Sequence, residues 1–273
     1  MRDLSYVSGT GAVEVGLDSR SLSAMGGLGI RGREWSYDLG ERGISSVARA
    51  AREAEVELAT RDLSEVDRAR RVMDRDVQLG TPGELVWRGE WRTGAYAVKC
   101  APSQAGRGGY RATLTVVLLD GVWRRERTTS YLPASATGGD WLDYPHDHPY
   151  DYMATPAPEA VHGAEWCESP CRLTIYGPAT DPVVIIAGNA YAADLTLPAG
   201  SRLVIDGLAR TVEEVTSTGL VVNRFSAARR GSGLGSGEYC FQPVPPGEST
   251  LAWSGAFGFD LTIWEEEGEP PLT

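Results

Sequence analysis

The sequence predicts a mainly β protein of two halves with one α-helix, and three features support this class. Most apolar residues fall in short runs with a period of two, which is typical of strands. Turns rich in Gly and Pro separate these runs. One segment, residues 62–79, has instead the three- and four-residue apolar spacing of an amphipathic helix. Because 273 residues exceed the ~100–200 usual for one domain, two domains are expected.

The strand before this helix is the clearest in the first half. Residues 54–59 alternate strictly, with Glu55 and Glu57 on one side and Val56 and Leu58 on the other. A period of two predicts a strand with one face in water. Four further strands are expected in this half: Glu84–Arg88, Ala95–Cys100, Tyr110–Leu119 and Val122–Tyr131.

The helix, Asp62–Leu79, has recognisable ends. Asp62 and Glu65 form a start like a capping box, and Gly80 and Pro82 end the helix. The expected buried stripe contains Leu63, Val66, Ala69, Met73 and Val77. The expected outer face contains Arg68, Arg71, Asp74 and Arg75.

Regular periodicity stops between residues 133 and 160, in a segment rich in Pro, Gly, Asp and Tyr. Such a break between two β-rich halves indicates a domain boundary or an ordered strap. We therefore divide the chain into a first domain at 1–135, an ordered linker or strap at 136–160, and a second domain at 161–273.

The second half predicts an antiparallel β-sandwich, because many short strands follow one another without a helix signal. The expected strands are Cys171–Tyr176, Pro182–Ala187, Asp194–Leu197, Arg202–Ile205, Leu220–Asn223, Glu238–Phe241, Thr250–Trp253 and Phe257–Trp264. The stretch Gly188–Val212 carries turn residues but no reactive group, so Asp206 is expected to form a turn rather than to catalyse. The acidic end, Glu265–Thr273, is expected to be a mobile tail or a partner contact.

Charge is distributed unevenly along the chain. Residues 1–133 contain 20 Lys and Arg against 18 Asp and Glu, whereas residues 134–273 contain 6 against 19. Because Lys and Arg supply most of the affinity for phosphate backbones, nucleic-acid recognition by the second half is not expected. A solvated acidic surface or charge-steered docking onto a partner fits this half. No signal-peptide pattern and no long apolar run occur, so we expect a soluble, unexported chain without membrane insertion.

One cluster has metal-like composition: His146 and His148, with Asp143 and Asp151 nearby. A zinc site needs three or four convergent ligands, and the third histidine, His162, lies apart in a loop with Gly. We therefore expect no metal site.

The four cysteines are too few and too scattered for a disulfide framework. Cys167 and Cys171 have the spacing of a zinc half-site, but no second ligand pair accompanies them. Buried or incidental thiols are the expectation.

Catalytic motifs are not evident either. The chain has no Gly-x-Ser-x-Gly elbow, and nothing selects a glycosidase pair among its 37 acidic residues. The glycine run 231–237 is not followed by a helix, so it is expected to be a flexible hairpin tip with Arg229 and Arg230 at its base, or a loop that orders at a subunit contact. We expect no enzymatic activity, no catalytic residue and no cofactor.

Tryptophans offer a binding hypothesis. Six of the eight fall mostly in strand-like runs, where core packing is expected: Trp35, Trp87, Trp91, Trp123, Trp253 and Trp264. Trp141 and Trp166 lie in or beside the irregular segment and are the candidates for stacking on a saccharide.

The order of several turn and strand motifs resembles one known family over nearly the whole chain. In the first half these are residues 80–87 (GTPGELVW), 91–98 (WRTGAYAV), the long strand at 110–123 and the strap at 143–152. In the second half they are residues 175–178 (IYGP), 188–191 (GNAY), 200–206 and 244–249 (VPPGES). The chain thereby resembles the distal tail proteins (Dit) of long-tailed, non-contractile bacteriophages and prophages.

This resemblance implies a fold and a place in a virion. It implies an N-terminal β-barrel-like belt domain with one α-helix and a C-terminal galectin-like antiparallel β-sandwich. It further implies a homohexameric ring at the virion tail tip, synthesised and assembled in the host cytoplasm. The implied partners are the tail tube protein, the tape measure protein and the tail-tip or baseplate hub protein of the host-attachment apparatus, with adaptor or receptor-binding proteins as further partners.

Two other functions remain as alternatives. One is a host-saccharide-binding module that uses Trp141 or Trp166, and the other is a tail-associated hydrolase. The chain lacks the galectin sugar-binding motifs His-x-Asn-Pro-Arg and Trp-Gly-x-Glu, so sugar binding is not inherited from a galectin-like fold.

Overall fold

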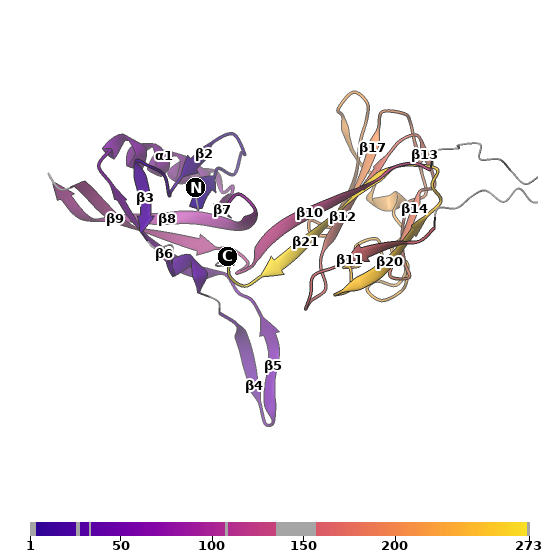
Figure 1. Ribbon diagram of the computed structural model, residues 1–273, viewed down its shortest axis with the longest axis horizontal. Coiled ribbons are helices and arrows are strands. Elements are labelled where there is room, and N and C mark those ends of the chain that lie inside the picture. The colour runs from indigo at the N-terminus through magenta and orange to yellow at the C-terminus, as the bar shows by residue number, and fades with distance from the viewer. Residues whose placement is uncertain (1–3, 26–27, 33, 107–108, 135–156, 272–273) are drawn as a thin grey trace, which may run out of the picture. The chain divides into compact units, whose positions relative to one another are not determined.

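The computed structural model describes residues 4–25, 28–32, 34–106, 109–134 and 157–271 (Figure 1). Within these ranges the chain is mainly β with one α-helix, and its strand pairs are antiparallel, which confirms the predicted fold class. The residues divide into two compact units. The N-terminal unit ends at Arg125 and also contains the C-terminal stretch from Glu266, and the C-terminal unit runs from Glu126 to Glu265.

The N-terminal unit is a sheet with the strand order β3-β6-β9-β8-β7-β1-β2. Its strands are β1 (Leu4–Val7), β2 (Glu14–Gly16), β3 (Leu22–Met25), β6 (Arg52–Thr60), β7 (Gly83–Trp87), β8 (Trp91–Gly106) and β9 (Gly109–Leu118). A short 3-10 helix, η1 (Leu28–Arg31), precedes β6 and contacts it. The predicted strand at 54–59 is confirmed within β6, where Val56 and Leu58 are buried and Glu55 and Glu57 are exposed.

The single α-helix, α1 (Leu63–Leu79), has the predicted ends. The Asp62 carboxylate accepts the Ser64 N–H at 3.0 Å, and Gly80 closes the helix in the left-handed conformation at φ 64°. The predicted stripe is partly wrong, because Leu63 and Val77 at its two ends are exposed. Val66, Ala69 and Met73 do pack into the core of the unit.

In the last helical turn the buried residue is Asp76, whereas Val77 was predicted. Its side chain is fully buried, and its Oδ2 accepts the Tyr6 hydroxyl at 2.9 Å and the Gly9 N–H at 3.0 Å. Burial and the Asp76 carboxylate together hold the pKa of Tyr6 well above its usual value. This group of hydrogen bonds joins α1 to β1 and the turn that follows it.

A separate hairpin, β4 (Ser36–Gly40) and β5 (Gly43–Ala48), extends from the N-terminal unit (Figure 1). Its two strands pair only with each other among the described strands, and every one of their residues is exposed. The strand expectations did not include this hairpin.

The C-terminal unit consists of two stacked antiparallel sheets. Its strands are β11 (Glu159–His162), β12 (Cys171–Tyr176), β13 (Ala179–Thr180), β14 (Val183–Ile186), β15 (Asn189–Ala192), β16 (Thr196–Leu197), β17 (Arg202–Asp206), β18 (Thr211–Val215), β19 (Val221–Asn223) and β20 (Glu248–Trp253). Strands β10 (Trp123–Tyr131) and β21 (Phe259–Glu267) contribute residues to both units.

The two sheets have the orders β19-β18-β17-β12-β21-β10 and β11-β20-β14-β15. Leu173 and Leu203 of the first sheet share one buried cluster with Val184 and Leu251 of the second. The predicted antiparallel sandwich is therefore present, with its core between the sheets. A short pair, β13-β16, lies beside them.

Two expectations about this half are wrong. Residues 238–241 are not a strand, although Cys240 and Phe241 are buried, because their backbone follows turns instead of a ladder. The glycine run 231–237 lies in a loop after η2 (Phe225–Ala227), and the Cys240 N–H donates to the Arg229 carbonyl at 3.2 Å, so Arg229 lies at the base of the loop as expected. Within the loop, the Gly235 N–H donates to Gln242 Oε1 at 2.8 Å.

The described part of the acidic end is also attached rather than mobile. Glu265–Glu267 belong to β21, and the Pro271 carbonyl accepts the Trp87 indole N–H at 3.2 Å within the N-terminal unit. The indole hydrogen bond and the strand ladder explain why this tail is held down.

Candidate functional surfaces

Trp166 is the most exposed tryptophan among the described residues, with 84% of its surface accessible. It lies in the loop between β11 and β12, whose base is fixed because the Ala164 N–H donates to Ser169 Oγ at 3.1 Å and Ser169 pairs with Val244. The exposure agrees with the expectation, and saccharide stacking stays a prediction. Trp141 lies outside the described residues.

Of the six tryptophans expected to pack in the core, all but one are buried. Five of them are buried in the two units: Trp87, Trp91, Trp123, Trp253 and Trp264. Trp35 is 42% exposed at the base of the β4–β5 hairpin, where the Arg49 guanidinium lies 4.6 Å from its ring centre.

Two buried thiols are unsuited to nucleophilic chemistry. None of the four cysteines forms a disulfide, and burial raises the pKa of Cys171 to about 12 and that of Cys240 to about 11. A thiol with so high a pKa is neutral at physiological pH, and the thiolate is the reactive form. Cys167 is exposed while Cys171 is buried in β12, so the two do not face one common site.

Within the described residues, no group of three or more His, Cys, Asp and Glu side chains is arranged to hold a metal ion. His162 ends strand β11 instead of lying in a loop, and its carbonyl accepts a hydrogen bond from Arg127. His146, His148, Asp143 and Asp151 lie outside the described residues.

Asp206 forms a turn, as predicted. Its Oδ1 accepts the N–H groups of Leu208 and Ala209 at 2.9 and 2.8 Å, immediately after β17. Its other oxygen lies 3.8 Å from the Arg172 guanidinium. These interactions occupy the carboxylate in local structure.

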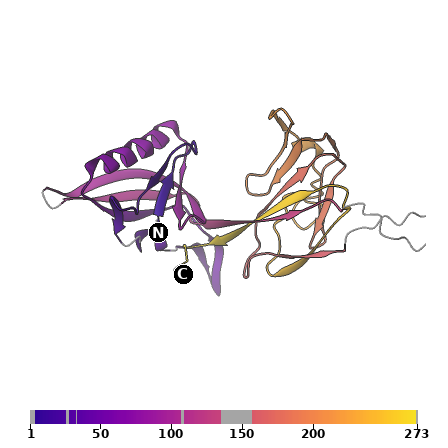
Figure 2. The same cartoon turned by 45° about the horizontal axis from the view of Figure 1, so that its top comes forward.

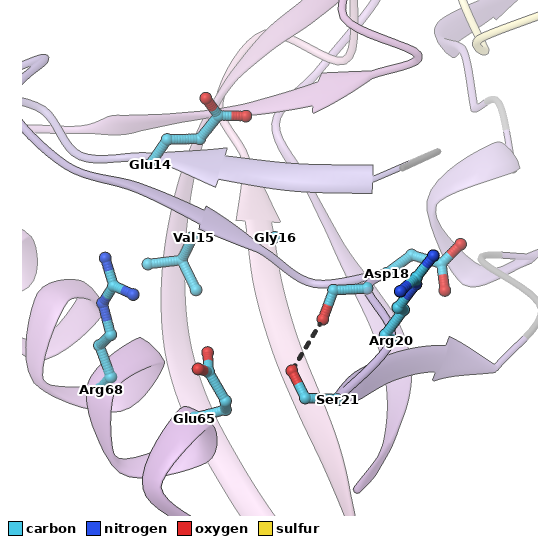
Figure 3. Close-up of a pocket in the computed structure, with 9 residues that line it drawn as sticks. Glu14, Val15, Gly16, Asp18, Arg20, Ser21, Glu65 and Arg68 are labelled. Atoms are coloured by element: carbon cyan, nitrogen blue, oxygen red, sulfur yellow. Dashed lines mark hydrogen bonds between the residues drawn. The ribbon is translucent and has the colours of Figure 1, made fainter. Parts of the chain in front are cut away.

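A hollow of about 670 Å³ opens between the N-terminal strands and the start of α1 (Figure 3). Its lining is charged and mixed in sign, with Glu14, Asp18 and Glu65 alongside Arg20 and Arg68. The hydroxyls of Ser19 and Ser21 share a hydrogen bond of 3.2 Å. No histidine or cysteine is among its described lining residues.

A smaller and more apolar groove lies between α1 and β8. Its cavity measures about 200 Å³ and is floored by the buried side chains of Leu58, Met73 and Leu114. At its mouth, Val98 is 49% exposed. Arg70, Asp74 and Lys99 also line the groove, and their side chains are exposed. We call this the helix groove.

The β4–β5 hairpin presents a second apolar surface. Tyr37 and Leu39 lie two residues apart in β4, and Leu39 pairs directly with Ile44 across the ladder. Residues two apart in a strand share a face, and so do directly paired residues, so these three side chains form an apolar face next to Trp35, which precedes the strand. Asp38 pairs with Ser45 on the opposite, polar face. We call these side chains, with the strands that carry them, the apolar hairpin.

The sequence analysis missed this surface, although its signal was present. The period-two apolar pattern at Trp35–Leu39, the turn Gly40–Gly43 and the apolar Ile44 are hairpin features. Because a buried core strand has the same pattern, the sequence did not indicate that these side chains are exposed.

Among the described residues, no helix has the length and apolar character needed to span a membrane.

Comparison with known proteins shows a shared fold at low sequence identity. No protein-family model and no curated protein sequence matches the chain. Among solved structures, the SPP1 Dit protein, described as a paradigm of the hub adsorption apparatus in phages infecting Gram-positive bacteria, matches with a TM-score of 0.57 and 11% identity. The match covers 97% of this chain and 99% of that one.

Chains of the phage p2 baseplate in its activated conformation, with Sr and with Ca, match with TM-scores of 0.60 and 10% identity. Each match covers 99% of this chain and 100% of the other. The chain therefore has the fold of the phage hub and baseplate proteins throughout its length.

Proposed function

We propose that this chain is a structural subunit of a phage tail tip, a distal tail protein without enzymatic activity. The observation that carries the proposal is the extent of the structural match: the matches to phage hub and baseplate structures cover 97–99% of the chain and therefore include both units. A shared fold alone does not establish function. The order of motifs along the sequence resembles the same family, and this agreement supports the proposal further.

In the finer form of the proposal, six copies form a ring at the end of the tail tube. The N-terminal unit, which includes the end of the chain from Glu266, forms the ring as a belt domain. Residues 136–160 act as a strap, and the rest of the C-terminal unit forms the galectin-like domain. The ring joins the tail tube and tape measure proteins to the tail-tip hub, with adaptor or receptor-binding proteins as further partners, in a virion assembled in the host cytoplasm. The six acidic C-terminal domains repel one another and remain available to these partners.

Light scattering coupled to size exclusion tests the ring. We expect an assembly of six 29.4 kDa chains, with its population rising with protein concentration. A chain that remains monomeric, both alone and with its tail tube and hub partners, would contradict the proposal.

A second candidate function, saccharide binding, rests on the exposure of Trp166. The flat indole on a fixed loop can stack on a sugar ring, and Trp141 is the other candidate for this role. This function is compatible with the ring, since it uses the C-terminal half.

Replacing Trp166 with alanine tests this second function. If the indole stacks on sugar, Trp166→Ala should weaken binding on a glycan array about tenfold, a loss of ~1.4 kcal/mol. Leu220→Ala, which removes another exposed apolar side chain of the same unit, is the control and should leave binding unchanged. Equal binding by wild type and Trp166→Ala would exclude the stacking role.

A further inference from the structure

We infer that the apolar hairpin of one copy docks into the helix groove of a second copy, with Leu39 in the groove and Ile44 over Val98. This inference rests on the proposed ring and names the contact that would close it. Both surfaces belong to the N-terminal unit, so the contact needs no particular placement of the two units.

The described part of the chain leaves the hairpin uncovered. Leu39 is 80% exposed, and Tyr37 and Ile44 are also exposed. A two-stranded hairpin without further packing is only marginally stable in water. Exposed apolar side chains gathered on one face mark an interaction surface when they are contiguous.

The helix groove fits the hairpin in size and chemistry. An apolar cavity of about 150 Å³ is known to accommodate a benzene molecule, so the groove of about 200 Å³ has room for the Leu39 side chain. Its floor is aliphatic, and the exposed Val98 extends this apolar surface to the mouth.

The charges near the two surfaces allow one complementary contact. Near the hairpin tip, Asp38 and Glu41 outnumber Arg42. Around the groove, Arg70 lies 3.5 Å from Asp67, and Lys99 is a second cation that lines the groove with Asp74. An acidic hairpin tip beside Lys99 favours the encounter and helps to fix the register more than it adds affinity.

The location of the two surfaces suits a ring. In both views the hairpin and α1 lie on opposite sides of the N-terminal unit (Figures 1 and 2). A contact between two different surfaces is heterologous, and repeated heterologous contacts close into a ring when the rotation between subunits permits. In a twofold dimer the hairpin and the groove would both have to lie in the one shared interface, each contacting the other surface of the partner, which their placement on opposite sides disfavours.

Disulfide cross-linking tests the contact. We would replace Ile44 and Val98 with cysteine in a Cys100→Ser/Cys167→Ser background. These two serine substitutions remove the native thiol that lines the groove, Cys100, and the exposed native thiol, Cys167. Cysteines are bridged only when their Cα atoms lie within about 7 Å. Mild oxidation of the assembled protein should give a ladder of covalent oligomers ending at the closed ring.

The matched control replaces Ser45 instead of Ile44, because Ser45 is adjacent in sequence but lies on the polar face. This Ser45→Cys/Val98→Cys variant should remain a monomer band on a non-reducing gel. If an intact ring gives no ladder with Ile44→Cys/Val98→Cys, or an equal ladder with the control, the hairpin–groove contact is wrong and the ring proposal survives. A chain that never assembles under any condition would overturn both.

Discussion

Replacing Asp76 with alanine is expected to destabilise the N-terminal unit by about 2–4 kcal/mol, because one buried and one half-buried donor lose their acceptor. Those donors are the Tyr6 hydroxyl and the Gly9 N–H, both bound to Asp76 Oδ2. Water cannot replace the carboxylate without opening the contact between α1 and β1. The loss should appear as faster hydrogen exchange in α1 and β1 and a lower urea midpoint for this unit.

Two variants control for this effect. Asp76→Asn keeps an acceptor oxygen at the same position and should lose clearly less stability than Asp76→Ala. Asp74→Ala removes an exposed carboxylate two residues earlier in the same helix and should change stability by less than about 0.5 kcal/mol. The C-terminal unit provides an internal reference, since its exchange should not change. Equal exchange in wild type and Asp76→Ala would show that the buried carboxylate contributes nothing to stability.

The second large effect concerns assembly rather than folding. Changing Leu39 and Ile44 together to aspartate should abolish ring formation, because burial of each aliphatic side chain contributes about 1.5–3 kcal/mol and a charge in its place must be desolvated. A loss of this size weakens each contact by at least about 100-fold. Light scattering at a concentration where the wild type is assembled should then report a monomer.

The fold of this double variant should be intact, since β4 and β5 pair only with each other among the described strands. Circular dichroism and the melting temperature should therefore match those of the wild type. Ser45→Asp, on the polar face of the hairpin, is the matched control and should still assemble. A ring that persists in Leu39→Asp/Ile44→Asp would exclude the apolar hairpin from the interface.

Local signals made the helix predictable. The cap at Asp62, the left-handed Gly80 and the apolar spacing of Val66, Ala69 and Met73 lie within one short segment, and each agrees with the others. Strand β6 was equally clear, because its alternation puts every glutamate on one face. Where local preference and tertiary packing agree, the sequence is sufficient.

The failures occurred where tertiary contacts decide. Asp76 follows Asp74 and Arg75 on a charged helix, and its burial depends on Tyr6, which is 70 positions away in sequence. Residues 238–241 contain the apolar spacing of a strand, yet Asn189 binds their backbone at Tyr239 in place of a ladder. The short strand β18 carries two glutamates, and Glu214 is buried against Arg224, which period-two reasoning does not foresee.

The candidate surfaces likewise separate into those that the local sequence indicates and those that depend on tertiary structure. A sequence can identify Trp166 as a tryptophan outside the strand pattern, and the loop geometry then exposes it. The apolar hairpin has the pattern of a buried strand pair, so only the structure reveals that its own chain leaves it uncovered. The helix groove has no sequence signal, because it is made by residues from α1, β6, β8 and β9.

The central claim is that this chain is a ring-forming structural subunit of a phage tail tip. Electron microscopy of the purified, assembled protein tests it most directly, because averaged images report both the number of copies and their symmetry. We expect closed rings with sixfold symmetry, in which the N-terminal units contact one another around an open centre. Particles that are monomers, or dimers with twofold symmetry, at the concentrations where the protein assembles would contradict it.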